Sequence, residues 1–421
     1  MIGQLIVYAL AYGGALLALV RPFHGVLIYI LFAVARPTKI FPGSIPYGNY
    51  SMVIGSAFII GWVLAGFGSW NFGRSRRVIF LIIGFFIWAI LSSIMNPKSP
   101  LTASMLDNLV KIVLPFLIGL TLVETWFDVR CLAYTLAIAA GIVVFREFES
   151  IEQWGIGVGD NVKAHTFAVG TALIFLIGTD CKRWIFKLGF FGLAAIALHV
   201  CLVHMSRGAM LGLVMGGMIG FFVIEKSGKS FALIGFGCVI AAILIGPSVI
   251  TEFTSTFAGG EARDASAESR FVFWAGMGRG ILDKPIFGVG PRRWMEVSAL
   301  YGLEANREGH NAWLQLTAET GLPGGLMIFF FYVTCIVRLL PIARGKEPDA
   351  NPSARPFAQA TVVTLSMWLI QQIFGSFYLL ELPYYIALLG AAVLKMTDKE
   401  SATASDISYA DARDFAPSPR R

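Results

Sequence analysis

Charged side chains are scarce in this sequence. Asp, Glu, Lys and Arg make up 14% of its 421 residues, whereas a typical soluble domain carries about 25%. Hydrophobic residues make up 56% and the mean hydropathy is +0.71, which is more apolar surface than a soluble core of this size can absorb. A lipid bilayer can absorb it, because lipid replaces water as the solvent of the side chains. The composition therefore excludes an ordinary soluble enzyme and predicts an integral membrane protein.

Motifs for metals and redox cofactors are also missing. The cysteines show neither CxxC spacing nor a histidine at metal-ligand spacing, which indicates ordinary buried thiols. They are Cys131, Cys181, Cys201, Cys238 and Cys335. The sequence has no DxD pair to hold Mg²⁺ for a nucleotide-sugar donor and no HExxH zinc motif. We therefore expect a protein that works without a metal or another cofactor. The net charge of +7 does not indicate a nucleic-acid partner, since the basic residues form short clusters between apolar runs.

Long apolar runs, in contrast, are abundant. A membrane helix needs about 20 mostly apolar residues. The candidate spans are 3–20, 24–36, 50–68, 77–95, 109–126, 130–146, 164–179, 184–204, 207–224, 229–249, 322–340, 357–375 and 379–396. The first two could form one broken element, so we predict an all-α, polytopic integral membrane protein with about 12–13 transmembrane helices. Residues 1–396 would form a single transmembrane domain with one larger polar insert, 250–320, that contains short helices.

Basic loops predict the orientation, because Lys and Arg are retained on the cytoplasmic side. Counting through the spans places four basic clusters on one face. These are Arg74, Arg76 and Arg77; Lys182, Arg183 and Lys187; Lys226 and Lys229; and Arg344, Lys346 and Arg355. We predict that this face is cytoplasmic, that the 250–320 insert is periplasmic, and that the polar tail 397–421 is disordered on the cytoplasmic side. Lys111, Glu124 and Glu381 lie near the ends of predicted spans, where charged side chains anchor at the interface.

The segment Gly309-His310-Asn311 is the first candidate for chemistry. Asn311 is a plausible helix cap, and 312–320 is predicted to be a short helix that ends at Gly321. His310 would then lie at the start of this helix on the external face, where backbone N–H groups favour an anion. A histidine at such a position could accept a proton from a hydroxyl group near neutral pH. The alternative is that His310 only caps the helix or binds a backbone carbonyl.

Several arginines reach the same predicted face. Arg207 follows Ser206 at the outer end of one span and Arg146 ends another, while the insert contributes Arg263, Arg270, Arg292 and Arg293. Guanidinium groups bind phosphate oxygens bidentately and stay charged when partly desolvated. Beside a candidate base, such a cluster suits a lipid-linked diphosphate, because the arginines would offset the charge of the leaving group. The alternative for an arginine at a span end is that it only snorkels to the interface.

The spacing of the histidine motif resembles a known family signature. His310-Asn311, nine residues and then Gly321-Leu322-Pro323-Gly324 resemble the pattern of bacterial O-antigen ligases and of the wider ligase/polymerase superfamily. Three further stretches agree in order, namely 206–209, Ser269-Arg270 with Trp274, and 283–290, so the specific resemblance covers about 200–325. It implies transfer of a glycan from undecaprenyl diphosphate to an acceptor hydroxyl on the periplasmic face of the bacterial inner membrane, with inversion and without a metal.

The resemblance also implies roles for individual residues. His310 would be the general base, and Arg207 and Arg270 would bind the diphosphate, with Arg292 or Arg293 as a further arginine; Asn311, Ser206, Gly321 and Gly324 would support them. The acceptor could be lipid A–core, as in lipopolysaccharide biosynthesis, a second lipid-linked glycan, as in a polymerase, or a protein Ser or Thr, as in a protein O-oligosaccharyltransferase. A flippase for lipid-linked glycans is disfavoured, since the central spans are nearly free of acids and bases.

Overall fold

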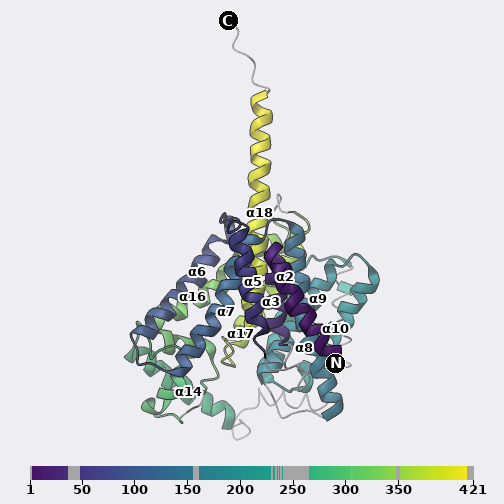
Figure 1. Cartoon of the computed structure of the whole chain (residues 1–421). Coiled ribbons are helices and arrows are strands. Elements are labelled where there is room, and N and C mark those ends of the chain that lie inside the picture. Colours follow the sequence, from purple (N-terminus) through teal and green to yellow (C-terminus); the bar gives the residue numbers. More distant parts are fainter. Residues whose placement is uncertain are drawn as a thin grey trace.

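The computed structural model describes residues 2–36, 48–154, 161–228, 265–304, 306, 308–347 and 351–414, together with a few positions between 231 and 239. Within these residues every regular element is a helix, so the prediction of an all-α, polytopic membrane protein is confirmed. The helices pack side by side as a bundle, and α18 projects from one end of it (Figure 1).

The N-terminal group contains α1 (Ile2–Tyr8), the π-helical turn η1 (Ala9–Gly13), α2 (Gly14–Val20), α3 (Pro22–Ala35) and α5 (Tyr50–Leu64). The next group contains η2 (Gly73–Ser75), α6 (Arg76–Ile94), α7 (Pro100–Leu122), α8 (Trp126–Trp154), α9 (Asn161–Asp180), α10 (Trp184–Val203) and α11 (Arg207–Val223). The polar insert forms α14 (Ala265–Asp283), α15 (Trp294–Val297) and η4 (Ser298–Tyr301), and the chain closes with α16 (Ala312–Ala343), α17 (Ala354–Gln371) and α18 (Glu381–Asp414).

Seven helices in the described part are long and apolar enough to cross a membrane, and α3, α5 and α11 are shorter apolar helices. Arg21 ends α2 and Pro22 opens α3, so the first two predicted spans are separate helices. The predicted span 109–126 is the C-terminal part of α7, which begins earlier because the Ser99 hydroxyl caps it and Pro100 occupies its first position. The predicted span 229–249 lies almost wholly outside the described residues, so the number of 12–13 spans stays a prediction.

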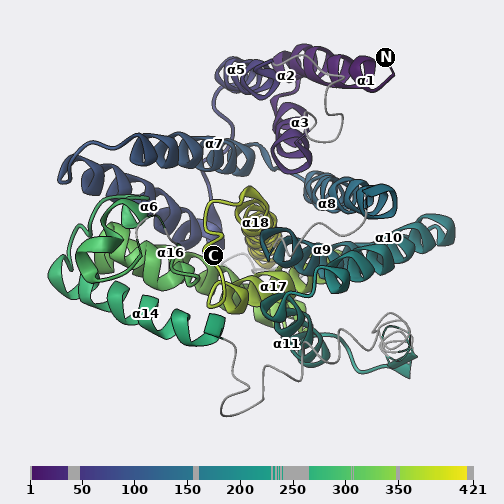
Figure 2. The same cartoon turned by 90° about the horizontal axis from the view of Figure 1, so that it is seen from below.

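The first half of α18 is the centre of the bundle. All its residues from Leu382 to Thr397 are buried, as expected for a helix that is apolar all round. It contacts α7, α8, α16 and α17, which surround it when the bundle is seen from below (Figure 2). The helix then continues to Asp414, whereas composition predicts a disordered tail over 397–421. The reason is local, because neither glycine nor proline interrupts the sequence between Gly390 and Asp414.

Loops that carry the predicted cytoplasmic clusters meet at one end of the bundle. Arg74 binds Glu347 at 2.8 Å, and Arg338 donates to the carbonyl oxygen of Arg74 at 2.9 Å. Lys399 on α18 donates to the carbonyl oxygen of Glu124 at 3.1 Å. The basic loop before α6, the α7–α8 turn and the α16–α17 loop therefore lie at the end from which α18 projects (Figure 1). The insert and the start of α16 lie at the opposite end.

Candidate functional site

The predicted histidine motif opens the longest apolar helix of the chain. Asn311 caps α16, and its Oδ1 accepts a hydrogen bond from the backbone N–H of Leu314 at 3.1 Å. Gly321 ends this first helical segment, as predicted, because its φ of 76° and ψ of 172° are not helical. A second helical segment follows across the kink and continues to Ala343. The nine residues between Asn311 and Gly321 are therefore one short helical arm in front of a membrane span.

At the kink, the glycine-rich turn 285–290 packs closely against the glycine-rich segment 321–324 of α16. At Gly321 a Cβ atom would lie 1.9 Å from the carbonyl oxygen of Ile286, and at Gly288 one would lie 2.5 Å from the carbonyl oxygen of Ala318. Pro323 has no N–H to offer the carbonyl of Glu319, which instead accepts the N–H of Gly290 at 2.9 Å. Only glycine allows the 285–290 turn to approach α16 this closely, so Gly288-Val289-Gly290 and Gly321-Leu322-Pro323-Gly324 form one joint.

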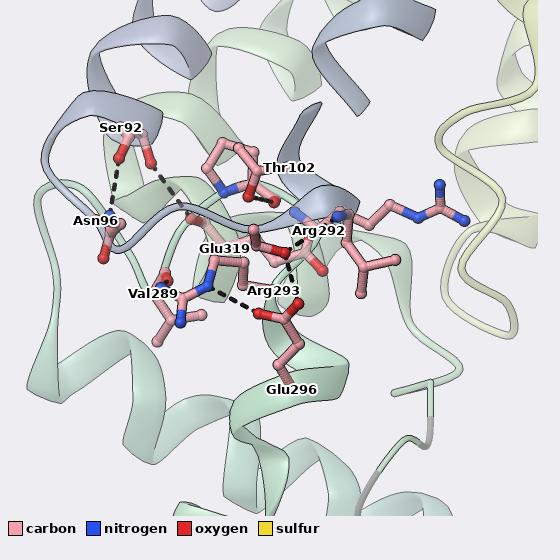
Figure 3. A network of polar contacts seen from close by, with 11 residues as sticks. Ser92, Asn96, Thr102, Val289, Arg292, Arg293, Glu296 and Glu319 are labelled. Atoms are coloured by element: carbon pink, nitrogen blue, oxygen red, sulfur yellow. Dashed lines mark hydrogen bonds and ion pairs between the residues drawn. The ribbon is translucent and has the colours of Figure 1, made fainter. Parts of the chain in front are cut away.

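A fully buried carboxylate lies beside this joint. The Glu319 side chain has no exposed surface. One oxygen accepts the backbone N–H of Arg292 at 3.0 Å (Figure 3). The same oxygen accepts the Tyr378 hydroxyl at 2.7 Å, and the other accepts the Gln315 amide at 3.1 Å. Burial, together with the neighbouring carboxylate, raises the pKa of Tyr378 well above its ordinary value, so its hydroxyl stays a donor. Glu319 thereby joins α16 to the insert and to the 372–380 loop before α18.

His310 lies on a strained turn that this network holds. Its φ is 49°, a left-handed conformation that is uncommon for residues other than glycine. The preceding N–H, that of Gly309, donates to Gln315 Oε1 at 3.0 Å, and the same oxygen accepts the Ser376 hydroxyl at 2.7 Å. His310 itself is half-buried.

The helix start does not offer the anion site that the sequence predicted. The N–H of Ala312 donates to the carbonyl oxygens of Gln372 at 2.8 Å and Gly375 at 2.9 Å, and the N–H of Leu314 donates to Asn311. These donors are already occupied by protein oxygens. The prediction of an anion held by the backbone of α16 is therefore wrong at these positions, and an anion beside His310 would have to be bound by side chains.

Arg292 and Arg293 point in different directions. Arg293 donates to Glu296 at 2.9 Å and to the carbonyl oxygen of Val289 at 3.0 Å, and only 13% of its side chain is exposed. The hydrogen bond from Ser99 lowers the pKa of Glu296, and Arg293 lowers it further. Arg292 has a positive φ of 58°, and its guanidinium extends away from this network (Figure 3) and donates to the Ser104 hydroxyl at 3.2 Å. Arg293 therefore stabilises the turn, whereas Arg292 presents its charge to the site.

The other predicted arginines lie on other elements, and the structure describes the surroundings of some of them. Arg207 is the first residue of α11, after the buried Ser206, and a Cβ at the adjacent Gly208 would meet His165 and Phe374. The start of α11 thus packs against the same 372–380 loop that contacts Ala312.

Arg270 lies on α14, which contacts the histidine motif. A Cβ at Gly309 would meet Met277 of this helix. Arg146 on α8 pairs with Glu149 of its own helix, and Arg263 lies outside the described residues.

Four residues of this site were not predicted from the sequence. Gln315 and Glu319 stand four residues apart on α16 and therefore share one face. Two polar residues at this spacing in an apolar helix could have indicated a buried polar contact. Ser376 and Tyr378 carry no such signal, since they meet α16 only through the fold. Among the described residues, no three His, Cys, Asp or Glu side chains are grouped closely enough to hold a metal ion.

The described architecture is that of a polytopic membrane protein with polar residues gathered between a kinked helix, the insert and a loop. Residues 192–329, about a third of the chain, match the family model described as O-antigen ligase. The match contains Arg207, Arg270, Arg292 and the whole histidine motif. This segment is therefore that of the O-antigen ligase superfamily, and the resemblance drawn from the motifs is confirmed. No match to a curated protein was found.

Proposed function

We propose that this protein is a glycosyltransferase that moves a glycan from undecaprenyl diphosphate to an acceptor hydroxyl on the periplasmic face of the inner membrane. The observation that carries the proposal is the meeting of three motif segments at the 372–380 loop. Ala312, beside His310, donates to this loop, Gly208, beside Arg207, packs against it, and Arg292 reaches it through Glu319 and Tyr378. The segments that carry the proposed base and two of the proposed arginines thus contact one loop at one end of the bundle.

In the proposed reaction His310 removes the proton from the acceptor hydroxyl. The acceptor oxygen attacks the anomeric carbon of the donor sugar from the face opposite the leaving group, so the configuration inverts. The bond between the anomeric carbon and the diphosphate oxygen breaks, and undecaprenyl diphosphate leaves with the electron pair. Arg207, Arg270 and Arg292 would offset the charge that develops on the diphosphate, as guanidinium groups can do without a metal. Arg293 and Arg146 would act less directly, because each has a carboxylate partner.

Transfer by the purified protein tests this proposal. The protein in proteoliposomes is given purified undecaprenyl-diphosphate glycan together with lipid A–core, a Ser/Thr peptide or a second lipid-linked glycan. We expect product with lipid A–core, as for an O-antigen ligase. Product only with the lipid-linked glycan would identify a polymerase, and product only with the peptide a protein O-oligosaccharyltransferase. Movement of the donor across the bilayer without transfer to any acceptor would overturn the proposal in favour of a flippase.

A further inference from the structure

A buried histidine stands at the end of α10, just before the turn that leads to Arg207. His204 is the C-cap residue of this helix, and only 3% of its side chain is exposed. Its Nδ1 lies 2.8 Å from the carbonyl oxygen of Val200, and its Nε2 lies 3.2 Å from Glu147 Oε1 on α8. A carbonyl and a carboxylate both accept hydrogen bonds, and only the imidazolium form of histidine has an N–H on each ring nitrogen. The geometry therefore indicates a positively charged His204.

The groups around His204 favour this charge. Glu147 faces it from α8, and the Lys163 ammonium of α9 binds the same Glu147 oxygen at 3.0 Å, which favours the ionised carboxylate. Burial alone would lower the pKa of His204, and Lys163 opposes its charge, but the hydrogen bonds to Glu147 and to the Val200 carbonyl raise the pKa above its ordinary value. The C-terminal end of a helix such as α10 also favours a cation.

The ion pair of His204 and Glu147 fixes one end of the turn between α10 and α11. It joins the end of α10 to α8 and, through Lys163, to the first turn of α9. The next residue, Met205, has a φ of 49°, a left-handed conformation that persists only where the surrounding structure holds it. Ser206 follows and is buried. The backbone that leads into α11 is therefore held by contacts with two other helices.

Close packing fixes the other end of the turn. A Cβ atom at Gly208 would lie 2.7 Å from His165 Nε2 of α9 and 2.9 Å from the Cβ of Phe374 in the 372–380 loop. The first turn of α11 therefore rests directly on α9 and on the loop that Ala312 contacts. Arg207, the first residue of α11, stands between the two anchors. Its direction depends on both of them, since a shift of either anchor would reorient the start of the helix.

We propose that Glu147 and His204 are positioning residues for the glycan transfer, because their ion pair holds the start of α11 so that Arg207 is directed at the donor diphosphate. This inference rests on the proposed function. Neither residue needs to touch the substrate. If one partner becomes neutral, the other is left as an uncompensated buried charge. The turn then loses its anchor, and the diphosphate is bound more weakly.

Steady-state kinetics in proteoliposomes test the positioning role. Glu147→Gln and His204→Gln are each expected to raise the donor KM about tenfold, with kcat and the acceptor KM unchanged, because a misplaced binding group loses affinity. Asp180→Asn is the matched control, because Asp180 of α9 pairs with Arg130 of α8 at 3.0 Å and so joins the same two helices near their other ends. It should affect only thermal stability. A donor KM that is unchanged in all three variants, or raised equally in all three, would overturn the proposal.

The pH dependence of the donor KM separates the charge of His204 from its shape. Because the pKa is raised, the imidazolium is fully present below the ordinary pKa of histidine and is lost as the pH rises through the raised value. The donor KM of the unsubstituted protein should therefore rise over this range, whereas that of His204→Gln should be high at every pH. The same rise in His204→Gln, or no rise in the unsubstituted protein, would contradict the proposal.

A measurement on the histidine itself separates this inference from the proposed function. Isotope-labelled histidine rings are titrated by NMR in detergent, and the signal of His204 is identified by its absence from His204→Gln. We expect this signal to titrate at a lower pH in Glu147→Gln and at an unchanged pH in Asp180→Asn, and equal titration in all of these proteins would overturn the ion pair. If the unsubstituted protein transfers no glycan, the proposed function fails, while the affinity of the same variants for undecaprenyl diphosphate still decides whether the pair positions Arg207.

Discussion

Both ends of the helical bundle contain arginine–carboxylate pairs, but the end that carries the insert also holds a buried carboxylate that is bound by neutral donors. At the end from which α18 projects, arginines bind carboxylates: Arg74 binds Glu347 at 2.8 Å, and Arg355 binds Glu225 at 2.8 Å. At the other end the fully buried Glu319 is bound by a tyrosine hydroxyl, an amide and a backbone N–H. The guanidinium of Arg292 meanwhile donates to a neutral serine hydroxyl.

The difference shows why an excess of arginine does not by itself mark a site. An arginine that pairs with a carboxylate in water has its charge largely satisfied, and such a pair adds about 0–1 kcal/mol to stability. A carboxylate that is satisfied by neutral donors organises the backbone around it and leaves the nearby guanidinium to bind an anion. Polar groups at the first end therefore stabilise loops, whereas those at the second end build a site.

The largest expected effect that separates the two ends is the loss of the base. His310→Ala should reduce glycan transfer by about 10²- to 10⁴-fold, the usual contribution of a general base, with unchanged membrane insertion and thermal unfolding. His199→Ala is the control, because His199 is a half-buried histidine on α10 that contacts the ring of Phe148 edge-on. A His310→Ala protein that keeps full transfer would contradict the assignment of the base.

Removal of the buried carboxylate should have the next largest effect. Glu319→Ala leaves the Tyr378 hydroxyl, the Gln315 amide and the N–H of Arg292 without their acceptor, so we expect a loss of about 2–4 kcal/mol in the free energy of unfolding. Glu347→Ala at the other end should cost about 0–1 kcal/mol. Denaturant titration of both variants in detergent measures the difference. Equal losses would show that the two ends do not differ in this way.

The two neighbouring arginines should separate binding from stability. Arg292→Ala is expected to raise the donor KM about 10- to 100-fold, the equivalent of about 1.4–2.8 kcal/mol, with little change in thermal unfolding. Arg293→Ala should mainly lower thermal stability, because it leaves Glu296 and the Val289 carbonyl without this donor. Steady-state kinetics and thermal unfolding of both variants check the pattern, and the opposite pattern would move the diphosphate to Arg293.

The last comparison concerns the glycine joint. Gly321 and Gly302 have φ values of 76° and 75°, but a Cβ at Gly302 would meet nothing within 4 Å. Gly302→Ala should therefore cost only the backbone strain of about 1–2 kcal/mol, and Gly321→Ala should cost about 1–3 kcal/mol more, since the 285–290 turn must move. Thermal unfolding of the two variants isolates this steric cost, and equal costs would show that the turn is free to shift.

Local sequence predicted part of this site well. The start of α16 at Ala312 follows from the Asn311 cap, and the break at Gly321 follows from a glycine two residues before a proline, because capping and backbone freedom depend on near neighbours. The start of α7 was not predicted, since hydropathy placed a span at 109–126, whereas the helix begins at Pro100 after the Ser99 cap.

The sequence by itself determined that the chain is an all-α membrane protein and that about 200–325 resembles the O-antigen ligases, because hydropathy and motif spacing are properties of consecutive residues. Only the tertiary structure decided that Arg292 faces the site while Arg293 supports the turn, and that Tyr378 completes the network of Glu319. These partners are separated by dozens of residues along the chain. They meet because the packing of α16 against the insert and the 372–380 loop buries polar groups, which must then find donors and acceptors among one another.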